Sequence, residues 1–311
     1  MVNERFTLER AYAHCERVAR DHYENFPVAS RLLPVSMRPH IAAIYAFARR
    51  ADDYADEPGF ETAERLRLLD EWESRLRRSV ETRGPNSLEG VDDPQPDDLV
   101  FLALGETIRH HSLPPSLFTD LLSAFRQDVT TTRYDTWTDV LDYCRRSANP
   151  VGRLVLRVAG YSDSRLDRSS DAVCTALQLT NFWQDLGRDW DHGRLYVPGE
   201  DLARADAKVS DLASRRLTIE WQDVMAALIQ RTRELFDLGR EVCDGVHGRL
   251  KWELRLTWLG GSRVLAKVAA ARQHSLGERP TLGLSDAPAL LRDAMLWKVG
   301  PRSTTPAPIA G

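Results

Sequence analysis

The sequence has few cysteines, no long apolar run and no excess of positive charge. Its 311 residues include only four cysteines, which are far apart and form no Cys-x-x-Cys pair. This usage is typical of buried thiols in a reducing compartment and implies neither disulfides nor a cysteine zinc site. Lys and Arg total 42 against 46 Asp and Glu, for a formal net charge of −4. The chain therefore lacks the basic surface that nucleic-acid binding requires.

Membrane-spanning and secretory segments are also missing from the sequence. No stretch approaches the roughly 20 apolar residues of a membrane span, and the residues from Met1 to Arg5 contain no signal-peptide core. We therefore expect a cytoplasmic protein. Peripheral contact with the inner face of a membrane stays open, although no amphipathic anchor stands out to support it.

The spacing of the apolar residues predicts an all-α fold. They recur at intervals of three and four, as at Leu117, Leu121, Leu122 and Phe125, and strand-like alternation is nearly absent. This pattern predicts about ten helices packed around one core.

We expect one helical domain over residues 1–300. The segment 83–98 has few apolar residues and several Pro and Gly, which predicts a mobile loop, and residues 301–311 are expected to form a flexible tail. Gly260 and Gly261 interrupt a long apolar pattern and predict a close helix approach or a bend.

Two Asp-x-x-x-Asp pairs, Asp52 with Asp56 and Asp185 with Asp189, lie in apolar stretches that predict helices. Four residues advance an α-helix by about 400°, so each pair places its carboxylates on one face, about 6 Å apart along the axis. Like charges at that spacing repel, and burial raises the cost unless a cation lies between them. If the two faces turn toward one another, their oxygen ligands suit Mg²⁺ bound to a phosphorylated substrate. The sequence therefore predicts a Mg²⁺-dependent diphosphate enzyme.

Context separates these two pairs from three others with the same spacing, Asp93/Asp97, Asp135/Asp139 and Asp167/Asp171. Prolines beside the first pair argue against a helix, and the other two lie in Ser/Thr-rich stretches, so all three are interpreted as solvated acids and helix caps. The first acidic helix is expected from about Arg38, and the second from about Arg168 to Trp190. An alternative stays open in which the acids of both helices lie on wet edges and pair with neighbouring arginines.

An adjacent histidine pair, His110 and His111, also invites a metal hypothesis. No third ligand stands near it in the sequence. The pair is therefore interpreted as polar surface side chains.

Longer motifs surround the acidic pairs and carry a resemblance to a known family. The motifs are Tyr45-x-x-x-Arg49-x-x-Asp52-Asp53-x-x-Asp56, Tyr143-Cys144-x-x-x-Ala148-x-x-Val151-Gly152, and Gln178-x-x-Asn181-x-x-x-Asp185-x-x-x-Asp189 followed by Gly193-Arg194-x-Tyr196. In this order they resemble the head-to-head trans-isoprenyl diphosphate synthases, the family of squalene, phytoene and dehydrosqualene synthases. The resemblance implies a single-domain helical bundle around a central apolar cavity.

The resemblance also implies roles for individual residues. The implied Mg²⁺ ligands are Asp52, Asp56, Asn181, Asp185 and Asp189. The implied substrate-binding residues are His22, Asn25, Phe26, Tyr45, Arg49, Gln178, Gln184, Arg194 and Tyr196. Tyr143 would join the four aspartates as a catalytic residue that faces the reacting carbons.

Two stretches, His22 to Ser30 and Ser147 to Arg153, resemble the bacterial hydroxysqualene synthase branch of hopanoid-type squalene biosynthesis. Gln184 stands where the synthases that condense two chains usually have Arg, and Asn149-Pro150 replaces a pair of small residues. The resemblance thus implies a carbon–oxygen lyase that converts presqualene diphosphate and water to hydroxysqualene and diphosphate. The sequence has no Gly-rich dinucleotide motif, which fits capture of the cation by water rather than by hydride.

Two other functions stay open at this point. A condensing synthase would make presqualene diphosphate, dehydrosqualene or phytoene from two prenyl diphosphates. A non-catalytic scaffold or assembly factor of the same fold would be expected to lose acidic ligands, whereas both motifs are intact here. The expected partners are a small prenyl diphosphate and enzymes of the same pathway, and the chain is expected to be a monomer or a homodimer.

Overall fold

The computed structural model describes residues 2–21, 33–56, 59–81, 94–271, 276–277 and 279–297, with side chains from residue 8 onward. Three predicted substrate-binding residues, His22, Asn25 and Phe26, lie outside the described residues. The same holds for most of the predicted loop 83–98 and for the predicted tail.

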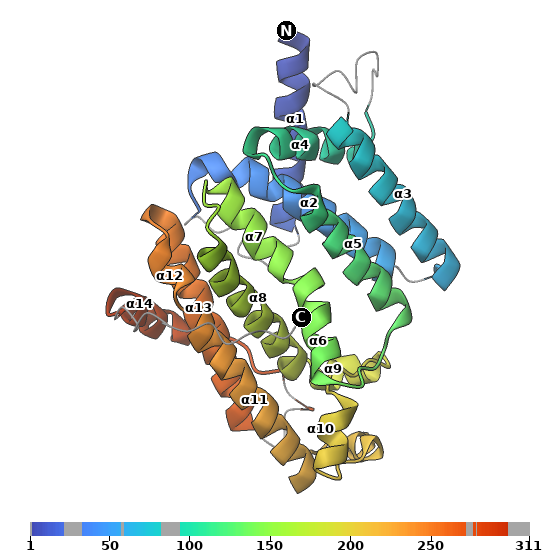
Figure 1. The fold of residues 1–311 in the computed structure, drawn as a ribbon, viewed down its shortest axis with the longest axis vertical. Helices are drawn as coiled ribbons and strands as arrows, with labels where there is room; N and C mark the ends of the chain where they lie inside the picture. Colours follow the sequence, from blue (N-terminus) through green and yellow to red (C-terminus); the bar gives the residue numbers. More distant parts are fainter. Residues whose placement is uncertain are drawn as a thin grey trace. The chain divides into compact units, whose positions relative to one another are not determined.

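Helices make up every regular element of the described residues, apart from one isolated bridge between Arg133 and Leu195 (Figure 1). The predicted all-α fold class is confirmed. Within the same residues, no helix is both long and apolar enough to cross a membrane.

The chain divides into two compact units. Unit 1 comprises Met1–Thr132 and Arg145–Ser162, and unit 2 comprises Arg133–Cys144 and Asp163–Gly311. The single domain over residues 1–300 stays a prediction. Each unit is described by itself below.

Unit 1 contains the first acidic motif. Its helices are α1 (Val2–Asp21), η2 (Val35–Met37), α2 (Arg38–Asp56), α3 (Thr62–Glu81), α4 (Pro96–His111), α5 (Pro115–Thr130) and α7 (Asn149–Val158). Helix α2 packs against α1, α3, α4 and α5. The acidic helix is therefore the central element of this unit, as its apolar sequence predicts.

An aromatic cluster fills the core of unit 1. Phe47 of α2 is fully buried, and its ring centroid lies 5.8 Å from that of Trp72, 6.1 Å from that of Phe101 and 5.6 Å from that of Phe118. The indole N–H of Trp72 donates to the carbonyl oxygen of Phe47 at 3.3 Å, so the polar group of this buried ring is satisfied. These contacts fix α2 against α3, α4 and α5.

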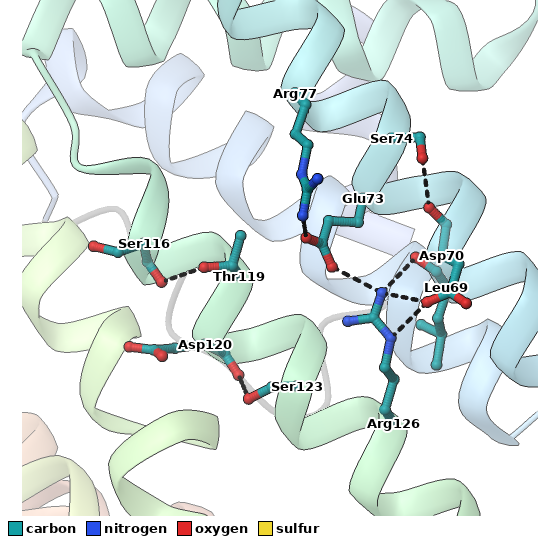
Figure 2. Close-up of polar contacts among 10 residues, drawn as sticks. All are labelled: Leu69, Asp70, Glu73, Ser74, Arg77, Ser116, Thr119, Asp120, Ser123 and Arg126. Atoms are coloured by element: carbon teal, nitrogen blue, oxygen red, sulfur yellow. Dashed lines mark hydrogen bonds and ion pairs between the residues drawn. The ribbon is translucent and has the colours of Figure 1, made fainter.

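Polar contacts tie α3 to α5 at the rim of this core (Figure 2). The Arg126 guanidinium of α5 lies 2.7 Å from a carboxylate oxygen of Asp70 and 2.8 Å from one of Glu73, both on α3. Arg77 approaches the same Glu73 at 2.5 Å. The Glu73 side chain is 15% exposed, and the two arginines hold the pKa of its carboxyl below the ordinary value against the opposing effect of burial.

Helix α4 begins earlier than the predicted loop 83–98 allows. Pro96 is its first residue, and Gln95 and Asp98 form the hydrogen bonds of a capping box, so proline starts this helix instead of preventing it. Asp97 is also not a solvated acid. Its carboxylate lies 3.3 Å from Arg50 and 3.7 Å from Arg75, and it accepts a hydrogen bond from the Tyr54 hydroxyl.

The prediction of a helix cap is confirmed at Asp139. Its carboxylate accepts a hydrogen bond from the Thr136 backbone N–H at 2.9 Å, and its own N–H donates to the Thr136 hydroxyl at 3.1 Å. This reciprocal pair begins α6 (Trp137–Ser147), which is divided between the two units at Cys144.

Unit 2 contains the second acidic motif. Its other helices are α8 (Ser164–Gln184), α9 (Leu186–Asp191), α10 (Gly199–Arg204), η4 (Val209–Ser214), α11 (Ile219–Gly239), α12 (Val242–Gly245), α13 (Gly248–Ala271), η6 (Leu284–Asp286) and α14 (Ala287–Met295). Helices α8, α11 and α13 pack together along their lengths (Figure 1).

Buried hydrogen bonds and a glycine hold these three helices close. The Trp183 indole N–H donates to the Thr232 hydroxyl at 2.9 Å, and the Ser169 hydroxyl donates to the Gly239 carbonyl oxygen at 2.7 Å. A Cβ at Gly261 of α13 would lie 2.4 Å from a methyl carbon of Leu177 and 2.8 Å from the Phe236 ring. The predicted close helix approach is confirmed at Gly261.

The four cysteines are free. Cys15, Cys144 and Cys243 are fully buried and Cys174 is partly exposed. Burial raises the pKa of the Cys15 and Cys243 thiols to about 12, which keeps both groups neutral and unreactive.

Candidate functional site

The first acidic motif occupies the last two turns of α2. The Arg49 guanidinium lies 3.2 Å from a carboxylate oxygen of Asp52 and 2.7 Å from one of Asp53, one helical turn further on. The buried face of the same turns is made of Ala51 and Ala55. The chain thus presents three acids and a cation on one side of a helix whose other side is core.

The carboxylates of this motif are less buried than their apolar surroundings in the sequence predict. The Asp52 side chain is 42% exposed, and Asp56 is exposed at the end of the helix. Tyr45, one turn before Arg49, is partly exposed, and burial raises the pKa of its hydroxyl. The alternative of a wet helix edge is borne out in part, because Arg49 does pair with the acids.

The second acidic motif does not lie on one continuous helix, contrary to the prediction of a helix from 168 to 190. Helix α8 ends at Gln184, Asp185 leaves the helical conformation, and α9 begins at Leu186. The Asp185 N–H still donates to the Asn181 carbonyl oxygen at 2.8 Å, and the Asp189 N–H donates to the Asp185 carbonyl oxygen at 2.9 Å. The break therefore preserves the local spacing of the acids while it ends the long helix.

Asp189 is the most perturbed acid of the described residues. Burial, with a second contribution from the nearby Asp185 carboxylate, raises the pKa of Asp189 to about 7. The positive charges of Arg194, His192 and Arg279 oppose this effect without cancelling it. A carboxyl in this state lacks charge compensation, and a divalent cation would supply it.

An arginine that none of the motifs includes binds Asp185. The Nε and Nη2 atoms of Arg279 lie 2.5 and 3.0 Å from the two Asp185 carboxylate oxygens, which makes the contact bidentate. Arg279 is 94 residues further along the chain, and no spacing signal in the sequence links it to the acidic motif. Sequence reasoning therefore missed a cation of this site.

The segment that carries Arg279 is held in place by two further contacts. The buried side-chain amide of Gln184 donates to the Pro280 carbonyl oxygen at 2.6 Å. Gly187, between the two acids, meets the backbone of Leu276, where an added Cβ would lie 2.3 Å from the carbonyl oxygen. Gln184, which the resemblance places among the substrate-binding residues, thus positions the arginine segment in this structure.

The remaining polar residues of this motif differ in exposure. On α8, Asn181 is exposed and Gln178 is partly exposed. Arg194 follows the turn after α9, where its backbone N–H donates to the Asp189 carbonyl oxygen at 2.8 Å. The structure therefore brings Asp185, Asp189 and Arg194 together.

A buried aromatic cluster lies in unit 2. The rings of Phe182 and Tyr196 stack with centroids 3.7 Å apart and an interplanar angle of 6°. Tyr143 lies 5.9 Å from Phe182, and Tyr134 lies 5.8 Å from Tyr143 and 5.6 Å from Tyr196. Tyr134 belongs to none of the sequence motifs. Trp183 has its indole N–H bonded to Thr232 and is part of the α8–α11 core.

Backbone contacts hold the strand-like exit that carries Tyr196. Gly193 has a φ of +78°, which lets the chain turn after α9. The Arg133 guanidinium donates to the Gly193 carbonyl oxygen at 2.5 Å, and the Arg133 backbone forms a bridge with Leu195. The Gly199 N–H donates to the Tyr134 carbonyl oxygen at 2.9 Å. The same contacts therefore place the aromatic cluster and the Arg194 side of the acidic motif.

The chain belongs to the squalene/phytoene synthase family, whose family model matches residues 19–286. That range includes both acidic motifs, the aromatic cluster and Arg279.

Individual relatives agree with this assignment. The chain is 36% identical to the hydroxysqualene synthase of Zymomonas mobilis over 230 residues. The aligned part is 73% of this chain and 72% of the relative. It is 38% identical over 218 residues to the hydroxysqualene synthase of Rhodopseudomonas palustris, over 70% of this chain and 69% of the relative. The crystal structure of squalene synthase HpnC from Alicyclobacillus acidocaldarius superposes with a TM-score of 0.75 at 40% identity, over 85% of this chain and 94% of that one.

We expect Gly187→Ala to weaken both the fold and the activity. The added Cβ would press on the Leu276 backbone, which cannot yield as a flexible side chain does, and the displaced segment would carry Arg279 away from Asp185. The clash should cost about 1–3 kcal/mol of unfolding free energy. Displacement of the Arg279 guanidinium from the acidic motif should lower kcat/KM by about 10–100-fold.

Thermal melting and steady-state kinetics measure these two effects. Gly199→Ala is the matched control, because its Cβ would meet Asp135 at an ordinary 3.5 Å. If Gly187→Ala kept the melting temperature of the wild type, the position of the Leu276 segment would not depend on its close approach to Gly187.

Proposed function

We propose that this chain converts presqualene diphosphate and water to hydroxysqualene and diphosphate, as a step of squalene and hopanoid biosynthesis. The observation that carries the proposal is the likeness to two hydroxysqualene synthases at 36% and 38% identity over about 70% of both chains. The branch-specific stretch Ser147 to Arg153 lies in the part that the family matches.

The acidic motifs fit a hard divalent cation, for which we propose Mg²⁺. The proposed ligands are the side-chain oxygens of Asp52, Asp56, Asn181, Asp185 and Asp189. Oxygen donors suit Mg²⁺, and the raised pKa of Asp189 marks a carboxyl that lacks charge compensation. When bound, the metal would neutralise the negative charge that develops on the leaving diphosphate. Asp52 and Asp56 belong to unit 1 and the other three to unit 2, so their action on shared ions stays a prediction.

Arginines supply the other positive charges of the proposed mechanism. Arg49 is paired with Asp52 and Asp53, and Arg279 is paired with Asp185. With a cation on the carboxylates, each guanidinium would be available to donate hydrogen bonds to diphosphate oxygens. Arg194 stands beside Asp189 and would do the same. Such donors lower the barrier because they interact more strongly with the leaving group than with the intact ester.

The aromatic cluster suits the carbocation that this ionisation leaves. The C–O bond of presqualene diphosphate breaks with its electron pair on the diphosphate, the cyclopropylcarbinyl cation rearranges, and a water oxygen bonds to the cationic carbon and loses a proton. Tyr143, Phe182 and Tyr196 have buried rings whose faces stabilise positive charge. Their packing also limits the water that reaches the cation, which favours capture at one position.

A condensing synthase is the second candidate, and one observation favours it. The relative HpnC, 40% identical, carries the description squalene synthase. Such an enzyme would start from two molecules of farnesyl diphosphate.

Product analysis decides between the two functions. The purified chain is incubated with Mg²⁺ and either presqualene diphosphate or farnesyl diphosphate, and the extracted lipids are identified by mass spectrometry. The proposal expects hydroxysqualene from the first substrate, with no effect of NADPH, and no C30 product from the second. Rapid formation of a C30 product from farnesyl diphosphate alone would establish the condensing function instead. No turnover of either substrate would favour a scaffold.

Chelation should abolish turnover. Because the nearby arginines do not offset the combined negative charge of the aspartates and a bound diphosphate, EDTA is expected to remove activity and added Mg²⁺ to restore it. Diphosphate release, followed by a coupled assay, measures both steps. Activity that persists in EDTA would refute a metal-dependent mechanism.

A further inference from the structure

We propose that His40, His110 and His111 bind a late first-row divalent cation such as Zn²⁺, at a site separate from both acidic motifs. All three residues belong to unit 1. The sequence suggested no metal here, because His110 and His111 are adjacent and the third histidine lies 70 positions earlier on another helix.

The fold brings the three imidazoles together. His40 is in the first turn of α2, and His110 and His111 are the last two residues of α4, which packs against α2. One possible ligand atom from each residue lies within 4.8 Å of the other two. The His111 ring centroid is 4.4 Å from that of His40 and 4.6 Å from that of His110. Three imidazoles from two helices form a more specific arrangement than an adjacent pair.

Hydrogen bonds already orient His40 as a metal ligand requires. Its Nδ1 atom lies 3.0 Å from the Thr107 hydroxyl and 3.2 Å from the Tyr12 hydroxyl, and these two oxygens are 3.1 Å apart. Thr107 is fully buried. Metal-binding histidines generally use one ring nitrogen for such a contact and the other for the metal. The arrangement leaves Nε2 of His40 as the ligand atom.

His111 supplies an independent observation. Its Nε2 atom is buried and has no hydrogen-bond partner among the residues that the structure describes. A buried polar atom in this state costs about 1–3 kcal/mol, and an ion that is not represented is one ordinary explanation for it. His110 is exposed, so an ion can reach the cluster from solvent.

The charge state of the cluster favours a metal over protons. Burial, with smaller contributions from His111 and His110, lowers the pKa of His40 to about 4, while Glu106 opposes this effect. Burial and His110 lower the pKa of His111 as well. Neutral imidazoles offer their lone pairs without first losing a proton. Glu106, the acid that acts on the pKa of His40, is paired with Arg109 at 2.9 Å.

The donor set selects the class of metal. Three imidazoles suit Zn²⁺, Cu²⁺, Ni²⁺ or Co²⁺, whereas Mg²⁺ requires oxygen ligands. His40 and Asp52 are twelve residues apart on α2, about 18 Å along the helix axis, so one ion cannot serve both. In tetrahedral zinc sites the ligand nitrogens are about 3.4 Å apart, as Zn–N distances of about 2.0–2.1 Å require. Binding would therefore draw α2 and α4 together, with water in the fourth position.

The test uses the full chain after removal of metals, in millimolar Mg²⁺ so that the acidic motifs are occupied. Zn²⁺ binding is measured by calorimetry and thermal melting, and Co²⁺ binding by its visible absorption spectrum. We expect one equivalent of Zn²⁺ to raise the melting temperature, and Co²⁺ to give the intense bands of a tetrahedral site. Each of His40→Gln, His110→Gln and His111→Gln should weaken Zn²⁺ binding at least tenfold, because Gln keeps polarity but ligates poorly.

Two further variants sharpen the test. Thr107→Val keeps the shape of Thr107 and removes the hydroxyl that holds His40, so it should weaken binding by about 10–100-fold. His247→Gln, outside the cluster, should bind as the wild type does. Wild-type Zn²⁺ affinity in all three cluster variants would overturn the proposal. The absence of Zn²⁺ binding would also overturn it. The same holds if the only response of the cluster is a fall in the melting temperature of the protein at acid pH.

Discussion

Asp189→Asn is expected to lower kcat by about 10²–10³-fold, the loss seen when one group that stabilises a developing charge is removed. The same change should raise the melting temperature of the metal-free protein at pH 8. Both effects come from the pKa of Asp189, which burial and Asp185 raise from 3.8 to about 7. The amide removes the negative charge of Asp189, which destabilises the metal-free fold. The same charge is needed to bind the metal during turnover.

The pH dependence has a definite sign. Because the pKa of Asp189 is higher in the folded chain than in the unfolded chain, folding favours the protonated form. This contribution to stability is fully present below about pH 4 and is lost as the pH rises through about 7. In EDTA, the melting temperature of the wild type should therefore fall more between pH 5 and pH 8 than that of Asp189→Asn. Mg²⁺ should reverse this fall in melting temperature in the wild type but not in Asp189→Asn.

Asp191→Asn is the matched control for this variant. Asp191 ends the same helix α9, is exposed, and pairs with Arg215 at 2.7 Å. Its variant should keep wild-type kcat and the wild-type pH dependence of melting. Wild-type turnover in Asp189→Asn would remove Asp189 from the proposed ligands.

The kcat/KM of Asp52→Asn is expected to be lower than that of Asp53→Asn by about 10²-fold or more, although the residues are adjacent. Both carboxylates pair with the same arginine, Arg49, at 3.2 and 2.7 Å. The loss of that ion pair is therefore common to the two variants. Asp52, four residues before Asp56, is a proposed metal ligand, whereas Asp53 is not. Equal losses would show that the acids serve to hold Arg49.

A double variant tests whether the two acidic motifs act on the same ions. Residues that work as one unit have strongly non-additive effects. Asp52→Asn combined with Asp189→Asn should therefore be little worse than either single variant. Losses that multiply would indicate independent roles for the two motifs.

Local patterns in the sequence predicted most of the fold and part of the site. The bounds of α2 follow from an apolar run that ends in acids, and the Gly261 contact follows from a glycine in a long apolar helix. The break at Asp185 could not be predicted, because a four-residue spacing is compatible with a continuous helix and with two helices joined by a cap. The interpretation of Asp97 as a solvated acid is wrong, because Pro96 is the first residue of α4 and does not interrupt a helix.

Long-range contacts account for the rest of what the sequence missed. Arg279 reaches Asp185 only because Gly187 lets a distant backbone approach, and His40 joins His110 only because α2 packs on α4. Tyr134 joins the aromatic cluster because of the bridge between Arg133 and Leu195. None of these pairs has a characteristic spacing, since tertiary packing alone sets the distance.

The central claim is that the chain ionises a carbon–oxygen bond and lets water capture the cation. Turnover of presqualene diphosphate in H₂¹⁸O, followed by mass spectrometry of the alcohol, tests it directly. Cleavage of the carbon–oxygen bond predicts hydroxysqualene that carries one ¹⁸O atom, with unlabelled diphosphate. An unlabelled alcohol with ¹⁸O in the released diphosphate would mean attack at phosphorus and would contradict cleavage of the carbon–oxygen bond.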